Sequence, residues 1–216
     1  MKYKLVIFDL DGTLLDTRGD IARALNMTLK EFGIRTLSDD IVGSYAGNGA
    51  YKLVERSVSG TGREDDIPAI AKSYRQNYQV YCLGLTRPFP GVVSMLEELR
   101  SNGIKIAVNS NKPQKTSEKV ISALLPGLID HIQGQLSGVG VKPDPAGAIR
   151  CMTEFGILPS ECCFVGDSEV DIMTGTNAGV DVICVDWGFK THEFLAEKNA
   201  PVICSDASSL TRLLLS

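Results

Sequence analysis

An alternation of short apolar runs with helix-like segments is the feature of this sequence that most constrains its fold. The apolar runs have strand length, are rich in β-branched residues and end in a polar residue or glycine: KLVIF before Asp9, IKIAV before Asn109, CFV before Gly166, DVICV before Asp186 and PVIC before Ser205. Helical patterns lie between the later runs, at 91–102, 114–125, 145–155 and 168–178. This order predicts an α/β fold with a doubly wound, mostly parallel, Rossmann-like sheet.

The segment 16–87 interrupts this alternation, because it has helical periodicity but no convincing strand. Helices are expected from Asp16 or Thr17 to before Gly33, from Ser38 onward, and over 64–82. A single crossover needs only a dozen or so residues, and this interval has about seventy. The return linker, LGLTRPFP at 83–90, contains glycine and proline. We therefore expect an α-helical cap domain at 16–87, inserted into an α/β core domain at 1–15 and 88–216.

Composition and charge argue against several classes of partner. The 22 Lys and Arg against 26 Asp and Glu give a formal net charge of −4, and no dense basic cluster is present to bind a row of phosphates. No apolar stretch is long enough to span a bilayer, and the N-terminal MKYKLVIFDLDG lacks the pattern of a signal peptide. The six cysteines have no CxxC spacing, which indicates buried or free thiols. We expect a cytoplasmic protein with no nucleic-acid or membrane partner.

The first apolar run leads into an unusual pair of acids, in the stretch VIFDLDGTLLD. Residues i and i+2 of an extended strand point to the same side, so Asp9 and Asp11 are expected to face one space. Parallel sheets bind ligands beyond the carboxyl ends of their strands, which is where this pair lies. Gly12 permits a turn there, and Thr13 can brace it. The alternative is that both acids only bond to local backbone.

Polar side chains also follow the later runs. Ser110 and Asn111 can offer a hydroxyl and an amide to an oxygen-rich ligand, although such residues also make turns and caps. Lys142 stands just before a helix, in Lys-Pro-Asp-Pro, a rigid setting that favours a positioned charge. Asp167 ends a strand, and Asp171 follows it by four positions. These strand ends are expected to meet in one cleft.

Carboxylates gathered in one cleft repel each other unless a cation joins them. The candidate ligands are the acids Asp9, Asp11, Asp167 and Asp171. Hard oxygen ligands with few histidines favour Mg²⁺ over zinc. His131 and His192 are isolated and lack the spacing of metal ligands, so we expect neither to bind metal.

Together these residues resemble, in order and placement, the four motifs of the haloacid dehalogenase-like hydrolase superfamily. The matching motifs are Asp9-Leu10-Asp11-Gly12-Thr13, Ser110, Lys142-Pro143, and Gly166-Asp167 with Asp171. The helical insert is similar to the smaller, mobile cap of that superfamily. Within the insert, GSYAGNGAYKLVER at 43–56 resembles the cap segment of phosphoglycolate phosphatases.

The resemblance implies a Mg²⁺-dependent phosphatase acting on a small phosphorylated metabolite such as 2-phosphoglycolate. It implies that Asp9 takes the phosphoryl group as an aspartyl-phosphate, while Asp11 protonates the leaving alcohol and then activates water. Ser110 and Lys142 would hold the phosphoryl oxygens, with Asn111 beside them. Mg²⁺ would be bound by Asp9, the backbone carbonyl of Asp11 and Asp167, with Asp171 a ligand directly or through water. An aspartate at the second position indicates phosphatase rather than dehalogenase chemistry.

The insert offers one candidate substrate contact. Gly47, Asn48 and Gly49 precede a helix-like segment at 50–57, so their backbone amides could bind a small carboxylate, although a simple turn is the alternative. Other functions also remain open at this point. They are a sugar-phosphate mutase or pyrophosphatase of the same superfamily, a phospho-accepting receiver domain of a signalling protein, and an inactive binding module. The protein is expected to be a monomer or a homodimer.

Overall fold

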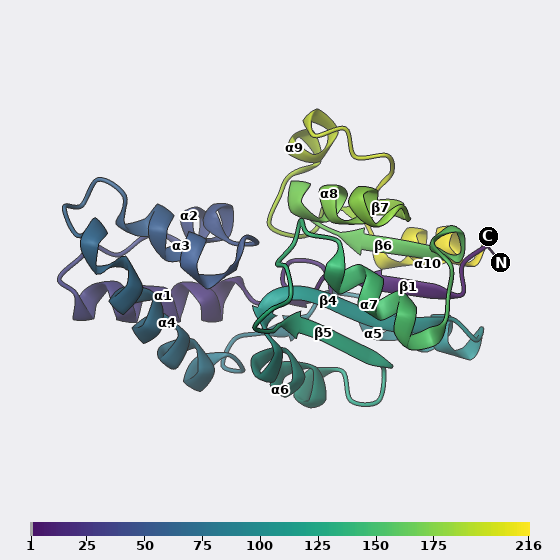
Figure 1. The fold of residues 1–216 in the computed structure, drawn as a ribbon, viewed down its shortest axis with the longest axis horizontal. Helices are drawn as coiled ribbons and strands as arrows, with labels where there is room; N and C mark the ends of the chain where they lie inside the picture. Colours follow the sequence, from purple (N-terminus) through teal and green to yellow (C-terminus); the bar gives the residue numbers. More distant parts are fainter. Residues whose placement is uncertain (1) are drawn as a thin grey trace. The chain divides into compact units, whose positions relative to one another are not determined.

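The computed structural model describes residues 2–216, and the chain divides into two compact units (Figure 1). The larger unit comprises Met1–Leu15 and Pro88–Ser216, and the smaller one is the continuous segment Asp16–Arg87. The chain crosses between the units at two short strands, β2 (Leu15–Asp16) and β3 (Arg87–Pro88), which pair as a two-stranded sheet. The sequence pattern predicts no convincing strand in 16–87. The two strands at the ends of this segment have only two residues each, which is too short to produce a recognisable pattern in the sequence.

The larger unit is built on a six-stranded sheet in the order β5-β4-β1-β6-β7-β8. Every one of its pairings is parallel. Its strands are β1 (Leu5–Phe8), β4 (Lys105–Pro113), β5 (His131–Gln135), β6 (Cys162–Gly166), β7 (Asp181–Val185) and β8 (Ile203–Cys204). Because β1 lies between β4 and β6, the chain winds outward from it in both directions, which confirms the doubly wound α/β fold.

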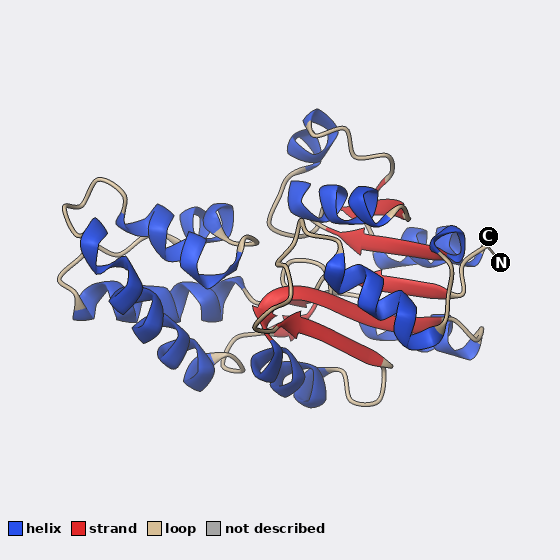
Figure 2. Cartoon of the chain, in the orientation of Figure 1, coloured by secondary structure: helices blue, strands red, loops and turns tan. Residues whose placement is uncertain are grey.

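Helices cover both faces of this sheet (Figures 1 and 2). They are α5 (Val92–Ser101), α6 (Gln114–Leu124), α7 (Ala146–Phe155), α8 (Glu169–Ala178), α9 (His192–Glu197) and α10 (Ala207–Leu215). The predicted ends of α7 and α8 are confirmed: Gly156 and Gly179 follow them with φ of 64° and 71°, the left-handed conformation that ends a helix and favours glycine. Both helices therefore stop where the sequence indicates.

The core of the larger unit forms around β1, whose four residues are all fully buried. Leu5 and Ile7 pack in one cluster with Phe164 of β6 and with Ala148 and Cys151 of α7. A strand covered on both faces reads as a continuous apolar run, which explains LVIF. The six cysteines are buried and free, as the sequence indicated, and burial raises the pKa of the Cys151 thiol to about 12.

The smaller unit is helical, with α1 (Arg18–Glu31), α2 (Asp39–Tyr45), α3 (Gly49–Val58) and α4 (Ile67–Tyr81). Helices α1 and α3 both pack against α4. Ser38 caps α2, since its Oγ accepts a hydrogen bond from the Ile41 amide at 3.4 Å, as the sequence predicted. The helix expected over 64–82 begins instead as a 3₁₀ turn, Glu64–Asp66, before α4.

The sequence pattern was wrong about the second strand of the sheet. It ended that strand before Asn109, whereas β4 continues to Pro113, with a shift of its register against β5 between Asn109 and Pro113. Ser110, Asn111 and Lys112 therefore belong to the strand, and all three are buried. A run of polar residues is typical of a turn. These three can be buried in a strand because other residues of the site supply their hydrogen-bond and ion-pair partners, which the sequence pattern does not show. The pattern also omitted β5, α9 and α10 and made β8 too long.

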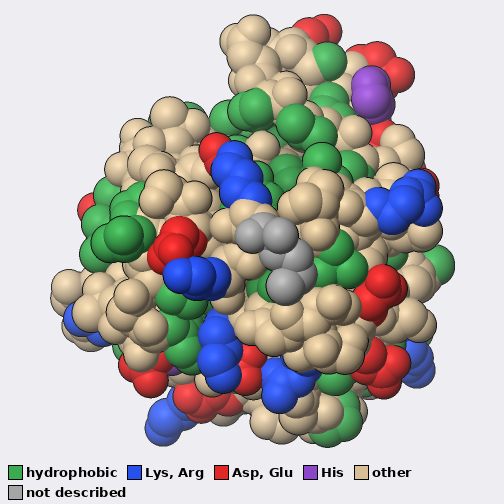
Figure 3. Space-filling model, turned by 90° about the vertical axis from the view of Figure 1, so that its right-hand side faces the viewer, with side chains coloured by type: hydrophobic (Ala, Val, Ile, Leu, Met, Phe, Trp, Pro, Cys, Tyr) green, Lys and Arg blue, Asp and Glu red, His purple; other side chains and the backbone are tan. Residues whose placement is uncertain are grey.

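No helix described within residues 2–216 is both long and apolar enough to cross a bilayer. On the face shown in Figure 3, Lys and Arg side chains are interspersed with Asp and Glu side chains.

Candidate active site

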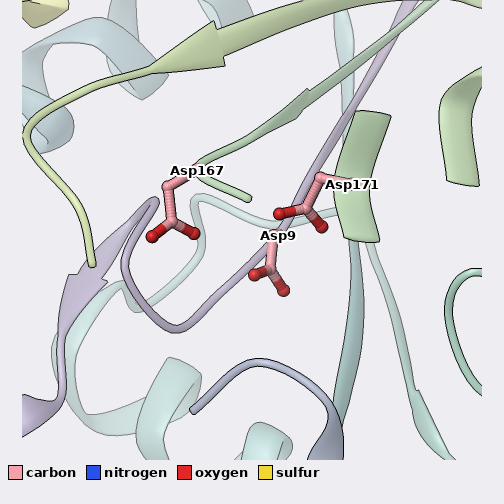
Figure 4. Close-up of side chains that lie close together, drawn as sticks. All are labelled: Asp9, Asp167 and Asp171. Atoms are coloured by element: carbon pink, nitrogen blue, oxygen red, sulfur yellow. The ribbon is translucent and has the colours of Figure 1, made fainter. Parts of the chain in front are cut away.

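Three aspartates meet at the carboxyl ends of the central strands. Asp9 directly follows β1, Asp167 directly follows β6, and Asp171 lies in the first turn of α8. One carboxylate oxygen from each lies within 4.8 Å of the others, and all three side chains are buried. Figure 4 shows the three carboxylates turned toward a common space. The adjacency of β1 and β6 in the sheet brings together residues that are far apart in the chain.

Crowding of these acids in a buried place changes their affinity for protons. Burial, with a further contribution from Asp171, raises the pKa of Asp9 to about 7, although Lys142 opposes the rise. Burial also raises the pKa of Asp167 well above its usual range, and the charges of Asp171 and Asp9 add to that rise. The positive charge of one lysine therefore does not balance the negative charge of these three carboxylates.

Lys142 is the buried cation of this group. Its Nζ lies 2.7 Å from Oδ1 of Asp9 and 2.6 Å from Oδ1 of Asp171. Burial disfavours the ammonium ion, but the carboxylates of Asp171 and Asp9 outweigh it and raise the pKa of Lys142 above its ordinary value. Lys142 thus bridges two of the three acids, as expected for a positioned charge and unlike a surface lysine.

Asn111 holds Lys142 in place through the backbone. The Lys142 amide donates to Asn111 Oδ1 at 2.8 Å, and Asn111 Nδ2 donates back to the Lys142 carbonyl at 3.1 Å. The structure thus places the Asn111 side chain against the backbone of Lys142. Ser110 precedes Asn111 in β4 with its side chain buried, and its Oγ accepts from the Lys112 amide at 3.2 Å.

Asp171 is fixed on both sides of its carboxylate. Oδ1 contacts Lys142, while Oδ2 accepts from the Ser168 amide at 3.1 Å and from the Ser168 hydroxyl at 2.6 Å. Helix capping therefore accounts for one oxygen of Asp171, more than the sequence pattern indicated, and the ion pair with Lys142 accounts for the other. This acid holds the start of α8 against the site.

Asp11 does not join the three acids, although the two-residue spacing predicted that it would face the same space as Asp9. Strand β1 ends at Phe8, and the chain then turns at Gly12, where φ is 89°. The Asp11 carboxylate forms an ion pair with Lys112. Burial, Lys142 and Asp171 have the largest effects on the pKa of Asp9. The charge of Asp11 has a smaller effect, and it raises that pKa. The two acids are therefore neighbours, although they have different partners.

Sequence reasoning missed the groups that hold Asp167. The Phe189 amide donates to Asp167 Oδ2 at 2.6 Å, and the Thr13 hydroxyl donates to Oδ1 at 3.3 Å. The loop after β7 is attached to the first motif, since Trp187 Nε1 donates to the Thr13 carbonyl at 3.0 Å. A backbone amide has no signature in sequence. The sequence could have indicated this loop only through its position, since it follows another strand-like run and therefore lies at the same edge of the sheet.

Glycines leave room for the carboxylates. A Cβ atom at Gly12 would lie 2.3 Å from Asp167 Oδ2, and one at Gly188 would lie 2.4 Å from the same oxygen. A Cβ atom at Gly166 would lie 2.2 Å from Cβ of Asp171. These separations are shorter than any real contact, so the glycines of the motifs are required by the acids beside them.

The donor set fits a hard divalent cation. It consists of three buried carboxylates with oxygens close enough to share one ion, and hard cations prefer oxygen ligands. A cation would also supply the positive charge that these acids lack. The histidines lie elsewhere: His131 Nδ1 is 4.0 Å from Glu154, and His192 Nδ1 is 2.8 Å from Asp186. Neither belongs to the acidic group.

The candidate substrate residues of the insert lie in the smaller unit. Gly47 and Asn48 precede α3, which begins at Gly49 rather than at residue 50. Asn48 occupies the N-cap position, and its side chain makes no capping hydrogen bond. The local geometry expected for this segment, a turn leading into a helix, is therefore present.

Comparisons with known proteins agree with this architecture. The family model described as haloacid dehalogenase-like hydrolase matches residues 6–185. A phosphoglycolate phosphatase from Aquifex aeolicus is 37% identical over 187 residues, covering 86% of each chain. One from Nitrosospira multiformis is 34% identical over 218 residues, covering 98% of this chain and 95% of that protein.

Solved structures give the same result. A crystal structure of a protein from Lactobacillus delbrueckii has a TM-score of 0.95 and 33% identity, covering 99% of both chains. A predicted phosphoglycolate phosphatase from Haemophilus somnus has a TM-score of 0.89 and 28% identity, covering 99% of this chain and 98% of that one. From the family match, the relatives and the fold, this chain belongs to the haloacid dehalogenase-like hydrolases.

Proposed function

We propose that the protein is a Mg²⁺-dependent phosphatase that hydrolyses a small phosphate monoester, with 2-phosphoglycolate as the first candidate. The observation that carries this proposal is the buried group of Asp9, Asp167 and Asp171 with Lys142 at the ends of the central strands. Relatives that align with nearly the whole chain are phosphoglycolate phosphatases, which supports the choice of substrate.

In this proposal Asp9 is the nucleophile. A carboxylate that approaches a phosphate ester is repelled by it, and Lys142 reduces that repulsion while holding one Asp9 oxygen. The ion would be held by Asp9, Asp167 and the backbone carbonyl of Asp11, with Asp171 in contact directly or through water. When bound, Mg²⁺ supplies the positive charge that offsets the phosphoryl oxygens and the carboxylates. Ser110 and Lys142 are the proposed donors to the phosphoryl oxygens.

The bonds and protons then balance in two steps. An Asp9 oxygen bonds to phosphorus as the bond to the alcohol oxygen breaks, and the Asp11 carboxyl gives its proton to that alcohol. Water next attacks the phosphorus of the aspartyl-phosphate, Asp11 takes a proton from that water, and the bond to Asp9 breaks. The products are the alcohol and inorganic phosphate, and both acids return to their starting states.

We also propose that the two compact units are a core domain, 1–15 and 88–216, and a cap domain, 16–87. Support comes from the compact division of the chain between Leu15 and Asp16 and between Arg87 and Pro88. In the cap, the backbone amides of Gly47, Asn48 and Gly49 are the proposed contacts for the carboxylate of a small substrate. No observation favours a mutase, a pyrophosphatase or a receiver domain.

The test of this function is phosphate release by the Asp9→Asn variant. The wild-type protein is incubated with Mg²⁺ and with phosphoglycolate, sugar phosphates, pyrophosphate or nucleoside monophosphates, and free phosphate is measured. Asp9→Asn keeps the size of the side chain but removes the attacking charge, so we expect it to lose turnover by several orders of magnitude while remaining folded. Asp144→Asn is the matched control, because Asp144 is exposed, lies near Lys142 in sequence and accepts a hydrogen bond from the Ala146 amide at the start of α7.

Three outcomes would contradict the proposal. Substantial turnover by Asp9→Asn would remove Asp9 from the role of nucleophile. A wild-type protein that releases no phosphate from any of these esters would exclude the phosphatase function altogether. Phosphate returned to the substrate, rather than released in equal amount with the alcohol, would indicate a mutase.

A further inference from the structure

A second buried lysine, Lys112, lies beside the site and has no role in the mechanism above. Its side chain is only 2% exposed, and its Nζ forms an ion pair with Oδ1 of Asp11, whose side chain is 17% exposed. A buried ammonium ion is costly unless a carboxylate compensates it. The pairing is therefore a largely buried ion pair, which differs from a flexible ion pair on the surface.

The backbone of Lys112 is held from several directions. Its amide donates to Ser110 Oγ at 3.2 Å, and its carbonyl accepts from Ser117 Oγ at 3.4 Å. Strand β5 also approaches closely, since a Cβ atom at Gly134 would lie 2.9 Å from the Lys112 carbonyl oxygen. Lys112 thus projects its side chain from a part of β4 whose backbone is held by Ser110 and Ser117.

The peptide groups on either side of Asp11 are held by hydrogen bonds with Leu15, but these bonds do not involve the Asp11 carboxylate. Strand β1 ends at Phe8, and Asp11 lies in the segment that follows, where it forms an isolated bridge to Leu15. An acid that must give a proton to one oxygen and take one from another has to stand in a defined place. The ion pair with Lys112 supplies that constraint.

We propose that Lys112 is the positioning residue of Asp11, and this inference rests on the proposed function. The site then assigns one lysine to each reacting acid: Lys142 holds the nucleophile Asp9, and Lys112 holds the proton-transfer group Asp11. Because Lys112 contacts Oδ1 of Asp11, Oδ2 is the oxygen that faces the leaving alcohol and the attacking water in this proposal. Lys112 itself touches neither the phosphoryl group nor the alcohol.

The leaving group of the substrate separates this role from others. A nitrophenolate needs no proton to depart, whereas an alkoxide does, so only transfer from an alkyl phosphate depends on a well-placed Asp11 in the first step. In Lys112→Met we expect phosphoryl transfer from phosphoglycolate, or the best alkyl phosphate found, to fall on the order of 100-fold. With p-nitrophenyl phosphate, rapid mixing should show a burst of one nitrophenol per site at nearly the wild-type rate, followed by slow turnover.

Controls make each outcome decisive. Lys115→Met removes an exposed lysine from the start of α6 and should change neither substrate's kinetics. Lys112→Arg keeps the charge and should restore part of the alkyl phosphate rate. Equal losses of the first step with both substrates would overturn the proposal, because Lys112 would then act on the phosphoryl group. A higher half-saturating concentration with an unchanged burst would also overturn it, because Lys112 would then bind substrate.

A double variant covers the case in which Lys112→Met does not fold. Asp11→Ala with Lys112→Met leaves no unpaired buried charge, and it is compared with Asp11→Ala alone. If Lys112 acts through Asp11, its removal in this background leaves the burst rate unchanged, and a further fall contradicts the proposal. A wild-type protein inactive on every ester would refute the proposed function, whereas an active one unaffected by Lys112→Met would refute only this inference.

Discussion

Gly12 combines two constraints that only glycine satisfies. Its φ of 89° is a conformation that other residues rarely adopt, and an added Cβ would lie 2.3 Å from Asp167 Oδ2. We expect Gly12→Ala to destabilise the fold by about 1 kcal/mol through the backbone and also to displace Asp167. The concentration of Mg²⁺ that gives half-maximal activity should therefore rise.

Gly103→Ala is the control for the backbone effect. Gly103 has a φ of 80°, but an added Cβ there would meet nothing within 4 Å. It should lower the midpoint of thermal unfolding without changing the Mg²⁺ dependence. If both variants shift the Mg²⁺ titration equally, or neither does, then Gly12 has no special relation to the acidic group.

Single residues differed in how well the sequence revealed them. Asp9, Asp167 and Asp171 could be predicted together, because parallel strands deliver their carboxyl ends to one edge of the sheet. The partner of Asp11 could not be predicted, since Lys112 stands in a strand whose true end depends on the site itself. The Phe189 amide could not be predicted either, because every residue except proline has one.

Asp20 ties the first helix of the smaller unit to its last segment. This fully buried carboxylate of α1 accepts from the amides of Leu85 and Thr86, at 2.9 and 2.8 Å, and from the Thr86 hydroxyl at 2.7 Å. Asp20→Ala would leave buried donors without a partner, so we expect a loss of about 2 kcal/mol or more in the free energy of unfolding. Denaturant unfolding of the whole chain measures this loss.

The comparison variant for Asp20 is Thr86→Val. It removes only the hydroxyl donor and retains both amide hydrogen bonds, so it should cost about 1 kcal/mol. Losses of equal size would show that the backbone amides contribute nothing. No loss in either variant would mean that Asp20 does not hold the return segment.

Elements were predictable where they are long, apolar or bounded by glycine. Helices α7 and α8 end where left-handed glycines follow them, and the apolar run of β1 is its strand. Strand β5 has the sequence HIQGQ and lies at the edge of the sheet. It was not predicted, because its polar residues do not form the apolar run that is typical of a buried strand. Helix α9 has six residues, too few turns to show helical periodicity in sequence.

At the scale of the whole molecule, the order of the strands creates the site. Because β1 lies between β4 and β6, the first motif meets the second on one side and the fourth on the other. The alternation of strands and helices was enough to predict this meeting, since doubly wound sheets bind ligands where the winding reverses. The detailed pairing of acids with lysines could not be predicted in this way, because it depends on the turns that follow the strands.

The charge balance of the folded protein predicts how Mg²⁺ and pH act together. Burial first, and then the charge of Asp171, raises the pKa of Asp9 to about 7 against an unfolded value of about 3.9, although Lys142 opposes this. Between these values the folded chain without metal retains a proton that the unfolded chain has lost. The contribution of Asp9 to stability is therefore greatest below about pH 4 and is lost as the pH rises toward about 7.

Mg²⁺ should reverse that loss, because it binds the ionised carboxylates and competes with the proton. We expect the increase in thermal unfolding temperature on adding Mg²⁺ to be larger at about pH 8 than at about pH 5.5. Asp9→Asn should reduce the difference between the two pH values. An equal increase at both, or a larger one at the lower pH, would contradict a metal site made of these acids.

The central claim is that Asp9 carries the phosphoryl group, and chemical trapping tests it most directly. In Asp11→Asn, p-nitrophenyl phosphate can still phosphorylate the enzyme, because its leaving group needs no proton, while attack by water is slowed. Quenching during the nitrophenol burst and reducing with borohydride converts an aspartyl-phosphate into homoserine, which peptide mass spectrometry locates. The account predicts homoserine at position 9. A burst of nitrophenol with homoserine at another position, or with position 9 unmodified, would contradict it.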